Sequence, residues 1–281
     1  MLYEKIDLYE YFRIARGGAR GGYLTAYSRT LPCRLRKRTR PAMLVVPGGG
    51  YGHVSTREGE PVALEFMHAG YCAFVLEYSI NTAYPVPLVE ACMAVAYIRE
   101  NANKYGVDEN HVGAVGFSAG GHLTGLLATA EHDNAVDAAL GKRARLARPD
   151  AVVLAYPVAT LGEHTHNGTR NVITGGDKAL RAALSVQNRV SKNSAPAFIW
   201  HTAADELVPV ENSFMLAAAY RAAGVPCELH IFERGRHGLS LACDETCDGA
   251  ASDVALYRVG AWSGLALDWL SSRGFKVEIG R

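Results

Sequence analysis

One short stretch of the chain holds a serine in the setting that a nucleophile requires. Gly116-Phe117-Ser118-Ala119-Gly120 fits the pattern G-x-S-x-G, in which a serine occupies a tight turn between a strand and a helix. Glycines suit this turn because the strand and helix backbones approach each other closely on either side of it. The turn would raise the Ser118 hydroxyl above the sheet and place the Ala119 N–H at a helix start, facing an oxyanion. The five residues alone also fit an ordinary turn with an exposed serine.

Two later residues could activate this serine. A serine hydroxyl is a poor nucleophile at neutral pH without a base within hydrogen-bond reach and an acceptor that orients the base. Asp205 follows a predicted strand, and His237 follows the last predicted strand in a glycine-flanked loop. Taken singly, Asp205 is equally typical of a turn or a helix cap, and His237 of a polar loop. Together with Ser118 they give the order Ser, Asp, His, each at the carboxyl end of its own strand, which predicts a catalytic triad.

A glycine-rich loop offers the remaining part of such a site. Pro47-Gly48-Gly49-Gly50-Tyr51-Gly52-His53 follows the predicted strand Ala42–Val46. Backbone N–H groups of Gly49 or Gly50 could face the site and bind an oxyanion together with Ala119. A phosphate-binding loop is the rival interpretation. It is disfavoured because no Gly-Lys-Ser/Thr follows the glycines and no G-x-G-x-x-G with a later acidic residue occurs after a strand.

Alternating strands and helices must position these residues. They predict an α/β fold with a mainly parallel central sheet and helices on both faces, in a single domain spanning residues 1–281. The predicted strands are Ala42–Val46, Cys72–Leu76, His111–Phe117, Asp150–Tyr156, Ala197–Thr202 and Cys227–Phe232. The predicted helices are Gly59–Ala69, a long helix from Pro85 or Pro87 to about Tyr105, Pro209–Ala223 and a closing helix Asp253–Leu270.

The first 40 residues predict an antiparallel lead-in. Tyr9–Ile14 and Tyr23–Tyr27 have strand character, with the glycine-rich segment Arg16–Gly22 between them. Its two Arg-Gly-Gly units could contact RNA, but a flexible hairpin loop is favoured. The basic run Arg34–Arg40 could be a nucleic-acid patch, and we expect a solvated loop before a buried strand instead.

The alternation weakens between Ala159 and Asn193, which predicts an insertion near the active site with a short helix at Ala179–Leu184. His164 and His166 lie in this segment, two residues apart. Without a third ligand they indicate surface histidines rather than a metal site, so we expect no metal.

Composition narrows the class of protein. The chain has 281 residues and a formal net charge of +1, which gives no electrostatic reason to expect nucleic acid or an anionic membrane as a partner. No signal peptide or membrane-spanning run is expected. The six cysteines are then expected to be free thiols of a cytoplasmic protein, although whether Cys243 and Cys247 pair is left open.

Residues 42–270 resemble the α/β-hydrolase fold esterases, in the acetylesterase/lipase-like branch that includes carbohydrate acetyl esterases such as acetyl xylan esterases. The resemblance is carried by four motifs and by the stretch from Tyr51 to Pro61. The motifs are Pro47-Gly48-Gly49-Gly50-Tyr51, Gly116-Phe117-Ser118-Ala119-Gly120-Gly121-His122, His201-Thr202-Ala203-Ala204-Asp205 and Gly235-Arg236-His237-Gly238. Pro47 departs from the histidine of the lipase-type His-Gly-Gly-Gly motif.

The resemblance implies a serine esterase that removes short acyl groups, acetyl in particular, from small esters such as acetylated oligosaccharides. Ser118 would attack the ester, His237 would move the proton, Asp205 would orient His237, and no cofactor would be needed. Two other interpretations stay open: a serine peptidase of the prolyl oligopeptidase type, and a hydrolase fold kept as a binding module. The alcohol part of the substrate and the oligomeric state are not predicted.

Overall fold

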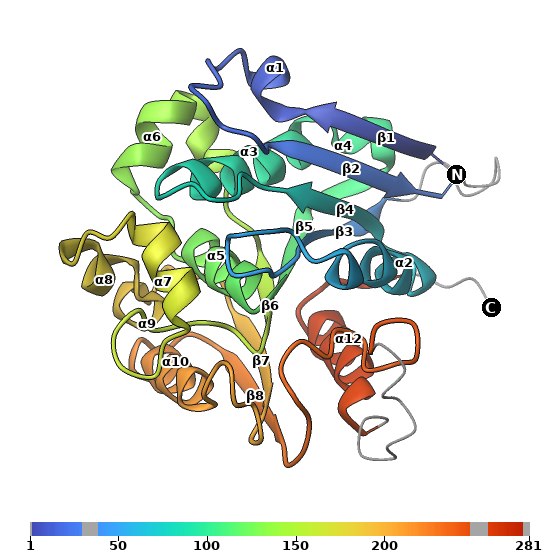
Figure 1. Cartoon of the computed structure of the whole chain (residues 1–281). Helices are drawn as coiled ribbons and strands as arrows, with labels where there is room; N and C mark the ends of the chain where they lie inside the picture. Colours follow the sequence, from blue (N-terminus) through green and yellow to red (C-terminus); the bar gives the residue numbers. More distant parts are fainter. Residues whose placement is uncertain (1, 30–38, 248–257, 278–281) are drawn as a thin grey trace.

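The computed structural model describes residues 2–29, 39–247 and 258–277. One eight-stranded sheet runs through them in the order β1-β2-β4-β3-β5-β6-β7-β8, and it twists strongly from β1 to β8 (Figure 1). The pairs β1–β2 and β2–β4 are antiparallel and the other five pairs are parallel. The strands are β1 Leu2–Asp7, β2 Tyr23–Ser28, β3 Arg40–Val46, β4 Cys72–Glu77, β5 Val107–Phe117, β6 Ala151–Ala155, β7 Ala197–Thr202 and β8 Cys227–Phe232. The predicted α/β architecture with an antiparallel lead-in is confirmed.

The sequences of the central strands are mainly apolar because helices cover both of their faces. Every residue of β3, β6 and β7 is buried, as is typical of parallel strands between two helical layers. The register pairs Val46 with Gly116, and Gly116 with Leu154. The carboxyl ends of β3, β5 and β6 therefore lie side by side, and the loops that follow them meet at one edge of the sheet.

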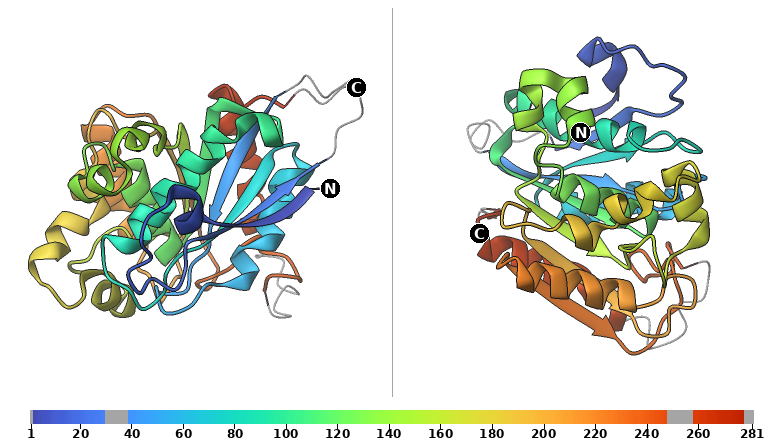
Figure 2. Two further views of the ribbon diagram at one scale, coloured as in Figure 1. Left: turned by 90° about the horizontal axis from the view of Figure 1, so that it is seen from above. Right: turned by 90° about the vertical axis from the view of Figure 1, so that its left-hand side faces the viewer.

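Helices cover the sheet in two layers (Figures 1 and 2). The apolar residues of α1, α3, α5, α6 and α10 belong to one hydrophobic cluster, and those of α2 and α12 belong to the cluster on the opposite face. The α-helices are α1 Leu8–Phe12, α2 Glu60–His68, α3 Val86–Glu100, α4 Ala102–Tyr105, α5 Ala119–Ala128, α6 Asn134–Leu140, α7 Asn167–Thr174, α8 Ala179–Leu184, α9 Val186–Arg189, α10 Glu211–Ala222 and α12 Trp262–Ser272. Two 3₁₀ helices are η2 Thr56–Glu58 and η3 Gly141–Leu146.

The prediction of a strand at Tyr9–Ile14 is wrong. The first strand is β1, and residues 8–12 form the short helix α1, whose first turn is capped by the Asp7 carboxylate through the N–H groups of Tyr9 and Glu10. Arg13 then adopts a left-handed conformation that ends the helix. A helix of one turn is too short to show a helical period, so its apolar residues also fit the alternation of a strand. The segment Arg16–Gly22 consequently joins α1 to β2, and with α1 it forms the connection between the antiparallel strands β1 and β2.

The basic run Arg34–Arg40 only partly meets the prediction of a solvated loop. Residues 34–38 lie outside the described residues, and Thr39 is exposed. Arg40, however, is the buried first residue of β3, and its guanidinium donates to Ser28 Oγ at 3.1 Å and to the Tyr105 carbonyl at 3.3 Å. A charged side chain is buried here because these acceptors partner it.

Two further helix predictions need adjustment. The long helix predicted to reach Tyr105 ends at Glu100, and a separate short helix follows after Asn101. The closing helix was predicted from Asp253, which lies outside the described residues, and α12 runs from Trp262 to Ser272. Within the described ranges, no helix combines the length and the apolar character needed to cross a bilayer.

Candidate active site

Ser118 occupies the sharp turn between β5 and α5. Its backbone angles are φ 54° and ψ −116°, which few residues other than glycine adopt without strain. A Cβ atom on Gly116 would lie 2.1 Å from Thr124 Oγ1, and one on Gly120 would lie 2.2 Å from the Val46 carbonyl oxygen. The turn therefore needs glycine at both positions for the reason that the motif suggests, namely close approach of neighbouring backbones. The Ser118 side chain is left at the carboxyl edge of the sheet.

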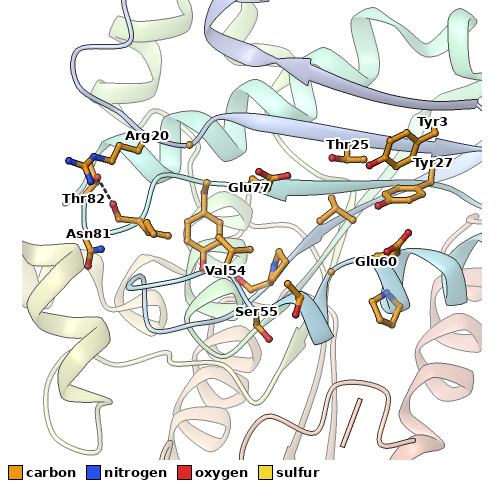
Figure 3. A pocket seen from close by; sticks show the side chains of 18 of the residues that line it. Tyr3, Arg20, Thr25, Tyr27, Val54, Ser55, Glu60, Glu77, Asn81 and Thr82 are labelled. Carbon is orange, nitrogen blue, oxygen red and sulfur yellow. Dashed lines mark hydrogen bonds between the residues drawn. The ribbon is translucent and has the colours of Figure 1, made fainter. Parts of the chain in front are cut away.

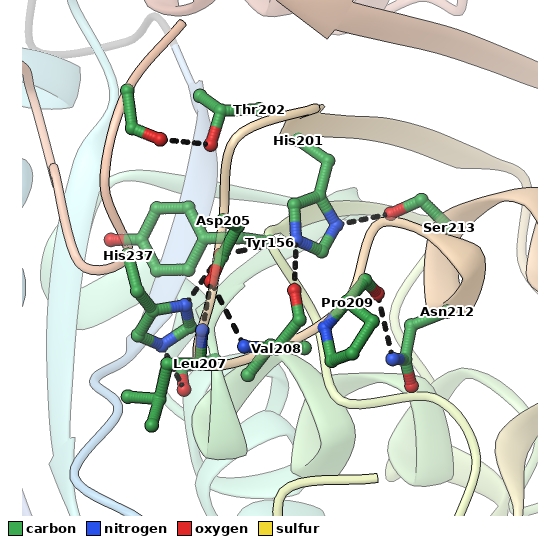
Figure 4. Close-up of polar contacts among 12 residues, drawn as sticks. Tyr156, His201, Thr202, Asp205, Leu207, Val208, Pro209, Asn212, Ser213 and His237 are labelled. Carbon is green, nitrogen blue, oxygen red and sulfur yellow. Dashed lines mark hydrogen bonds and ion pairs between the residues drawn. The ribbon is translucent and has the colours of Figure 1, made fainter. Parts of the chain in front are cut away.

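The structure brings the three predicted polar residues together, and Figure 4 shows Asp205 and His237 facing each other. His237 Nε2 lies 2.8 Å from Ser118 Oγ, and His237 Nδ1 lies 2.6 Å from Asp205 Oδ2. Both are hydrogen-bond distances, so the serine hydroxyl can donate to Nε2 while Nδ1–H donates to the carboxylate. The Asp205 side chain is fully buried and that of His237 is 13% exposed. This arrangement can move a proton from a serine oxygen onto an imidazole whose charge is balanced by a buried carboxylate.

Every acceptor position of the Asp205 carboxylate is occupied. Oδ1 accepts from the N–H groups of Leu207 at 3.0 Å and Val208 at 2.9 Å. Oδ2 accepts from His237 and, at 3.2 Å, from His201 Nε2. Burial alone would raise the pKa of this carboxyl, but the hydrogen bonds from His201 and His237 outweigh burial and hold the pKa well below its ordinary value. Asp205 is therefore a fixed anion at the back of the site.

His201 is a positioning residue that the sequence pattern did not single out. Its Nε2 lies 3.0 Å from the Val208 carbonyl oxygen as well as near Asp205, and both of these are acceptors. The proton must therefore be on Nε2, and Nδ1 accepts from the Ser213 hydroxyl at 2.8 Å (Figure 4). His201 thus ties the last residues of β7 to the loop that carries Asp205. No spacing rule marks this histidine, because its partners lie in the loop after β7 and on α10.

The glycine loop after β3 lies against the Ser118 turn. A Cβ atom on Gly48 would lie 3.1 Å from Ser118 Cβ, which shows how closely the two segments approach. The Gly48 N–H donates to Glu58 Oε2 at 2.8 Å. Among the described residues, the N–H groups of Gly49 and Gly50 donate no hydrogen bond. The N–H groups of Gly49 and Gly50 are therefore available as donors, as is that of Tyr51, which also donates to no described residue.

The buried Glu58 carboxylate links this loop to the histidine of the site. Its Oε1 accepts from the Tyr156 hydroxyl at 2.6 Å, and that hydroxyl accepts from the Ser240 N–H at 2.9 Å. The Tyr156 ring meets the His237 ring edge-on at a centroid distance of 5.0 Å. One carboxylate thus holds both the glycine loop, through Gly48, and the aromatic ring that supports His237. No motif marks Glu58, since only the folded chain places it next to Tyr156.

His122 connects the glycine loop to the segment between β6 and β7. Its Nε2–H donates to the Leu184 carbonyl at 2.8 Å, and its Nδ1 accepts from the Tyr51 hydroxyl at 2.9 Å. The imidazole is completely buried on α5, one turn after Ser118. Burial lowers the pKa of His122 from 6.5 to about 4. The ring is therefore neutral at neutral pH and acts as a structural link.

This buried histidine predicts a loss of stability in mild acid. The unfolded chain takes up a proton on His122 below pH 6.5, whereas the folded chain does so only near pH 4. The unfolded state therefore binds more protons between these values, and the free energy of unfolding should fall by up to about 3 kcal/mol as the pH drops from 6.5 to 4. Urea unfolding at several pH values, with wild type against His122→Gln, measures this difference. Parallel pH curves for the two proteins would contradict the expectation.

The two histidines of the segment between β6 and β7 differ from each other. His164 is exposed, as predicted for a surface histidine. His166 is only partly exposed, caps the start of α7 and lies beside the glycine loop, so the prediction of a surface residue fails for it. In the part of the chain that the structure describes, no cluster of three or more His, Cys, Asp or Glu side chains is arranged to hold a metal ion.

A cavity of about 940 Å³ lies beside the glycine loop (Figure 3). Tyr3 and Tyr27 lie at one end of it, Asn81 lies at the other, and Val54 and Ser55 line it from the loop. None of the three residues of the Ser118 site lines this cavity. The site is therefore located by its hydrogen-bonded side chains and not by this cavity.

Comparison with known proteins places this fold and site in a family. The sequence profile of the family described as BD-FAE matches residues 31–220, which is more than half of the chain. This chain belongs to the BD-FAE family. The BD-FAE match includes the glycine loop, Ser118 and Asp205, and it ends before His237.

Two curated relatives of this BD-FAE family member are longer proteins. The chain is 40% identical over 218 residues to endo-1,4-β-xylanase B of Butyrivibrio fibrisolvens, covering 75% of this chain and 34% of that protein. It is 31% identical over 206 residues to the acetylxylan esterase of Xylanibacter ruminicola, covering 70% of this chain and 40% of the relative. The chain thus spans well under half the length of either relative.

Solved structures match nearly the whole chain. The acetyl ester-xyloside bifunctional hydrolase from Caldicellulosiruptor lactoaceticus has 35% sequence identity and a TM-score of 0.81, covering 98% of this chain and 97% of that one. The carboxylesterase Cest-2923 from Lactobacillus plantarum WCFS1 has 30% identity and a TM-score of 0.82, covering 99% of both chains. An enzyme from a deep-sea metagenome library, described as an α/β hydrolase, has 31% identity and a TM-score of 0.76. The chain has the α/β-hydrolase fold.

Proposed function

We propose that this chain is a serine esterase that hydrolyses short-chain esters, acetyl esters in particular, of carbohydrates. The observation that carries the proposal is the unbroken hydrogen-bonded series from Ser118 Oγ through His237 to the Asp205 carboxylate. Family membership and the likeness to an acetylxylan esterase and to a carboxylesterase support the same reaction class.

The first half of the reaction would follow from these contacts. Ser118 Oγ attacks the ester carbonyl carbon while His237 Nε2 takes the hydroxyl proton, and Asp205 balances the charge that forms on the imidazole. When the tetrahedral intermediate collapses, the bond to the alcohol oxygen breaks and that oxygen takes the proton from Nε2. The acyl group is then bound to Ser118 and the alcohol is free to leave.

Water completes the cycle by the reverse sequence of proton transfers. His237 Nε2 takes a proton from a water molecule, whose oxygen attacks the acyl carbonyl carbon, and then returns the proton to Ser118 Oγ as the acid is released. The chain supplies the nucleophile and the base from its own side chains.

The oxyanion formed in both halves would be bound by backbone donors. Ala119 begins α5 directly after Ser118, so its N–H carries the partial positive charge of a helix start. Gly48 is excluded as a donor because its N–H already bonds Glu58. We therefore assign the other donors to Gly49 and Gly50, whose N–H groups bond no described residue. Removing one such donor typically lowers kcat by about 10²- to 10³-fold.

The preference for short acyl groups follows from what covers the site. The segment between β6 and β7 contains only short helices, the longest of which is α7 with 8 residues, and it offers no long apolar face of the kind that a lipase lid uses. His122 further anchors this segment to α5 through the Leu184 carbonyl. We infer that it closes over the site as a fixed cover with little space for a long acyl chain.

Chain-length dependence tests this proposal. We expect kcat/KM for p-nitrophenyl esters to be highest for acetate and to fall by about ten-fold or more beyond butyrate, because a longer chain must displace packed side chains. Acetylated xylo-oligosaccharides should release acetate under the same conditions, measured by an enzyme-coupled acetate assay. Equal or faster turnover of p-nitrophenyl octanoate would contradict the short-acyl assignment, and release of no acetate from the oligosaccharides would contradict the carbohydrate assignment.

We also infer that the protein works in a reducing compartment, the cytoplasm. The five cysteines among the described residues, including Cys243 and Cys247, are free thiols, and Cys33 lies outside those residues. Free thiols persist where glutathione and thioredoxin keep cysteines reduced. Cell fractionation tests this location, and recovery of the protein from the culture medium would contradict it.

A further inference from the structure

His166 reaches the active site from the segment between β6 and β7. A Cβ atom on Gly50 would lie 3.4 Å from His166 Cε1, so the imidazole rests directly on the glycine loop. The side chain also lies near enough to His237 for the charge of that residue to act on it. His166 is thus next to the proposed oxyanion donor Gly50 and within electrostatic reach of the proposed general base. Nothing in the proposed reaction uses it.

The hydrogen bonds of His166 determine which ring nitrogen carries the proton. Nδ1 accepts from the Thr169 N–H at 3.2 Å and lies 2.9 Å from Thr169 Oγ1, which caps the first turn of α7. A nitrogen that accepts from a backbone N–H cannot carry a proton itself, so the neutral ring is protonated on Nε2. Burial, and then repulsion from His237, lower the pKa of His166, which favours this neutral form. The side chain is therefore a fixed Nε2–H donor.

The proposed reaction indicates which part of the substrate lies next to this donor. The carbonyl oxygen of the ester faces the N–H groups of Gly49, Gly50 and Ala119. The alcohol oxygen must lie against His237, because it leaves with the proton of that residue. The alcohol part therefore lies on the His237 side of the ester, and His237 is close enough for its charge to act on His166.

We propose that the Nε2–H of His166 binds a hydroxyl group adjacent to the ester oxygen, so that the enzyme selects monoesters of vicinal diols, such as partly acetylated sugars, over simple alkyl esters. This inference rests on the proposed esterase function and specifies the alcohol that the site accepts. A sugar ring that carries one acetyl group presents such a neighbouring hydroxyl, whereas an alkyl ester of the same size does not. A donor left unpaired against an apolar alcohol costs binding free energy, which gives the selection.

Two substitutions separate this role from that of the helix cap. In His166→Asn, the short amide can still cap α7, because asparagine is a favoured N-cap residue, but it cannot reach as far as Nε2. In His166→Gln, the longer amide places an N–H near the position of Nε2 and gives up the cap. The first variant thus loses the proposed contact and keeps the helix start, and the second does the opposite.

The test uses two esters of equal size, 2-hydroxyethyl acetate and propyl acetate. We expect the wild type to prefer 2-hydroxyethyl acetate by about ten-fold in kcat/KM, mainly through KM, because a hydrogen bond made to the bound substrate persists in the transition state. His166→Asn should abolish this preference, because neither ester then meets the Nε2–H donor. His166→Gln should keep most of the preference but unfold at lower temperature.

The outcomes distinguish this inference from the proposed function. Equal losses on both esters in His166→Asn, or a preference that both variants leave unchanged, would overturn the role of His166 while the esterase assignment stands. A wild type that prefers 2-hydroxyethyl acetate but does not act on acetylated xylo-oligosaccharides would overturn the carbohydrate assignment and uphold the hydroxyl contact. A wild type that hydrolyses neither small ester nor p-nitrophenyl acetate would overturn both.

Discussion

Ser118→Ala is expected to lower kcat for p-nitrophenyl acetate by about 10⁴- to 10⁶-fold, because the side chain that forms the covalent bond is gone while binding and backbone donors remain. The variant should fold, since the backbone contact that holds the turn, from the Ser118 N–H to the Ala155 carbonyl at 3.0 Å, does not involve the hydroxyl. Steady-state kinetics together with far-ultraviolet circular dichroism measure both effects.

Ser55→Ala is the matched control for Ser118→Ala. Ser55 contacts the glycine loop through its backbone. Its N–H donates to the Gly48 carbonyl at 3.1 Å. This variant should keep kcat within about twofold of the wild type. A folded Ser118→Ala protein that retains more than a hundredth of the wild-type rate would eliminate Ser118 as the nucleophile.

Asp205→Asn is expected to lower kcat by about 10³- to 10⁴-fold while changing KM little. The N–H groups of Leu207 and Val208 would hold the amide oxygen where Oδ1 lies now. The amide NH₂ would then take the place of Oδ2 and point a donor at His237 Nδ1, which currently donates to that position. His237 would respond by placing its proton on Nε2, and in that form it cannot accept the proton of Ser118.

A tautomer change has a direct spectroscopic readout. Nitrogen-15 chemical shifts of the His237 ring should show the proton on Nδ1 in the wild type and on Nε2 in Asp205→Asn. Asp137→Asn, an exposed carboxylate on α6, is the control and should leave both the rate and the tautomer unchanged. A variant at position 205 that keeps a tenth of the wild-type kcat would show that the carboxylate does not orient the base.

The local part of the site could be predicted from the sequence. The turn at Ser118 is specified within a few residues. Positions 116 and 120 must both be glycine, because a Cβ atom at either position would clash with neighbouring atoms. Asp205 and His237 could be proposed because each follows a strand of a predicted parallel sheet, and such strands end at a common edge. Their distances to Ser118 could not be predicted, because those depend on how β7 and β8 are placed against β5 and β6.

The residues that support the site could not be predicted from the sequence, for one shared reason. Glu58 acts by contacting Gly48 and Tyr156, and His201 by contacting Asp205 and Ser213. Apart from the pair His201 and Asp205, these partners are ten or more residues apart in the chain. No periodicity or motif encodes such contacts. The error at Tyr9–Ile14 has a different cause, since a helix held by a single cap at Asp7 is too short for its pattern to show.

The amino-acid sequence by itself determined the class of fold, the strained serine turn and the order of the three polar residues, because these depend on side-chain patterning over short stretches. Only the tertiary structure decided that His166 rests on the glycine loop, that Gly48 is already bonded and that His122 ties Tyr51 to the segment between β6 and β7. The physical reason is that a hydrogen bond depends on the distance and direction between its donor and acceptor atoms. Two residues can satisfy it only after the packing of the sheet and its helices has brought them together.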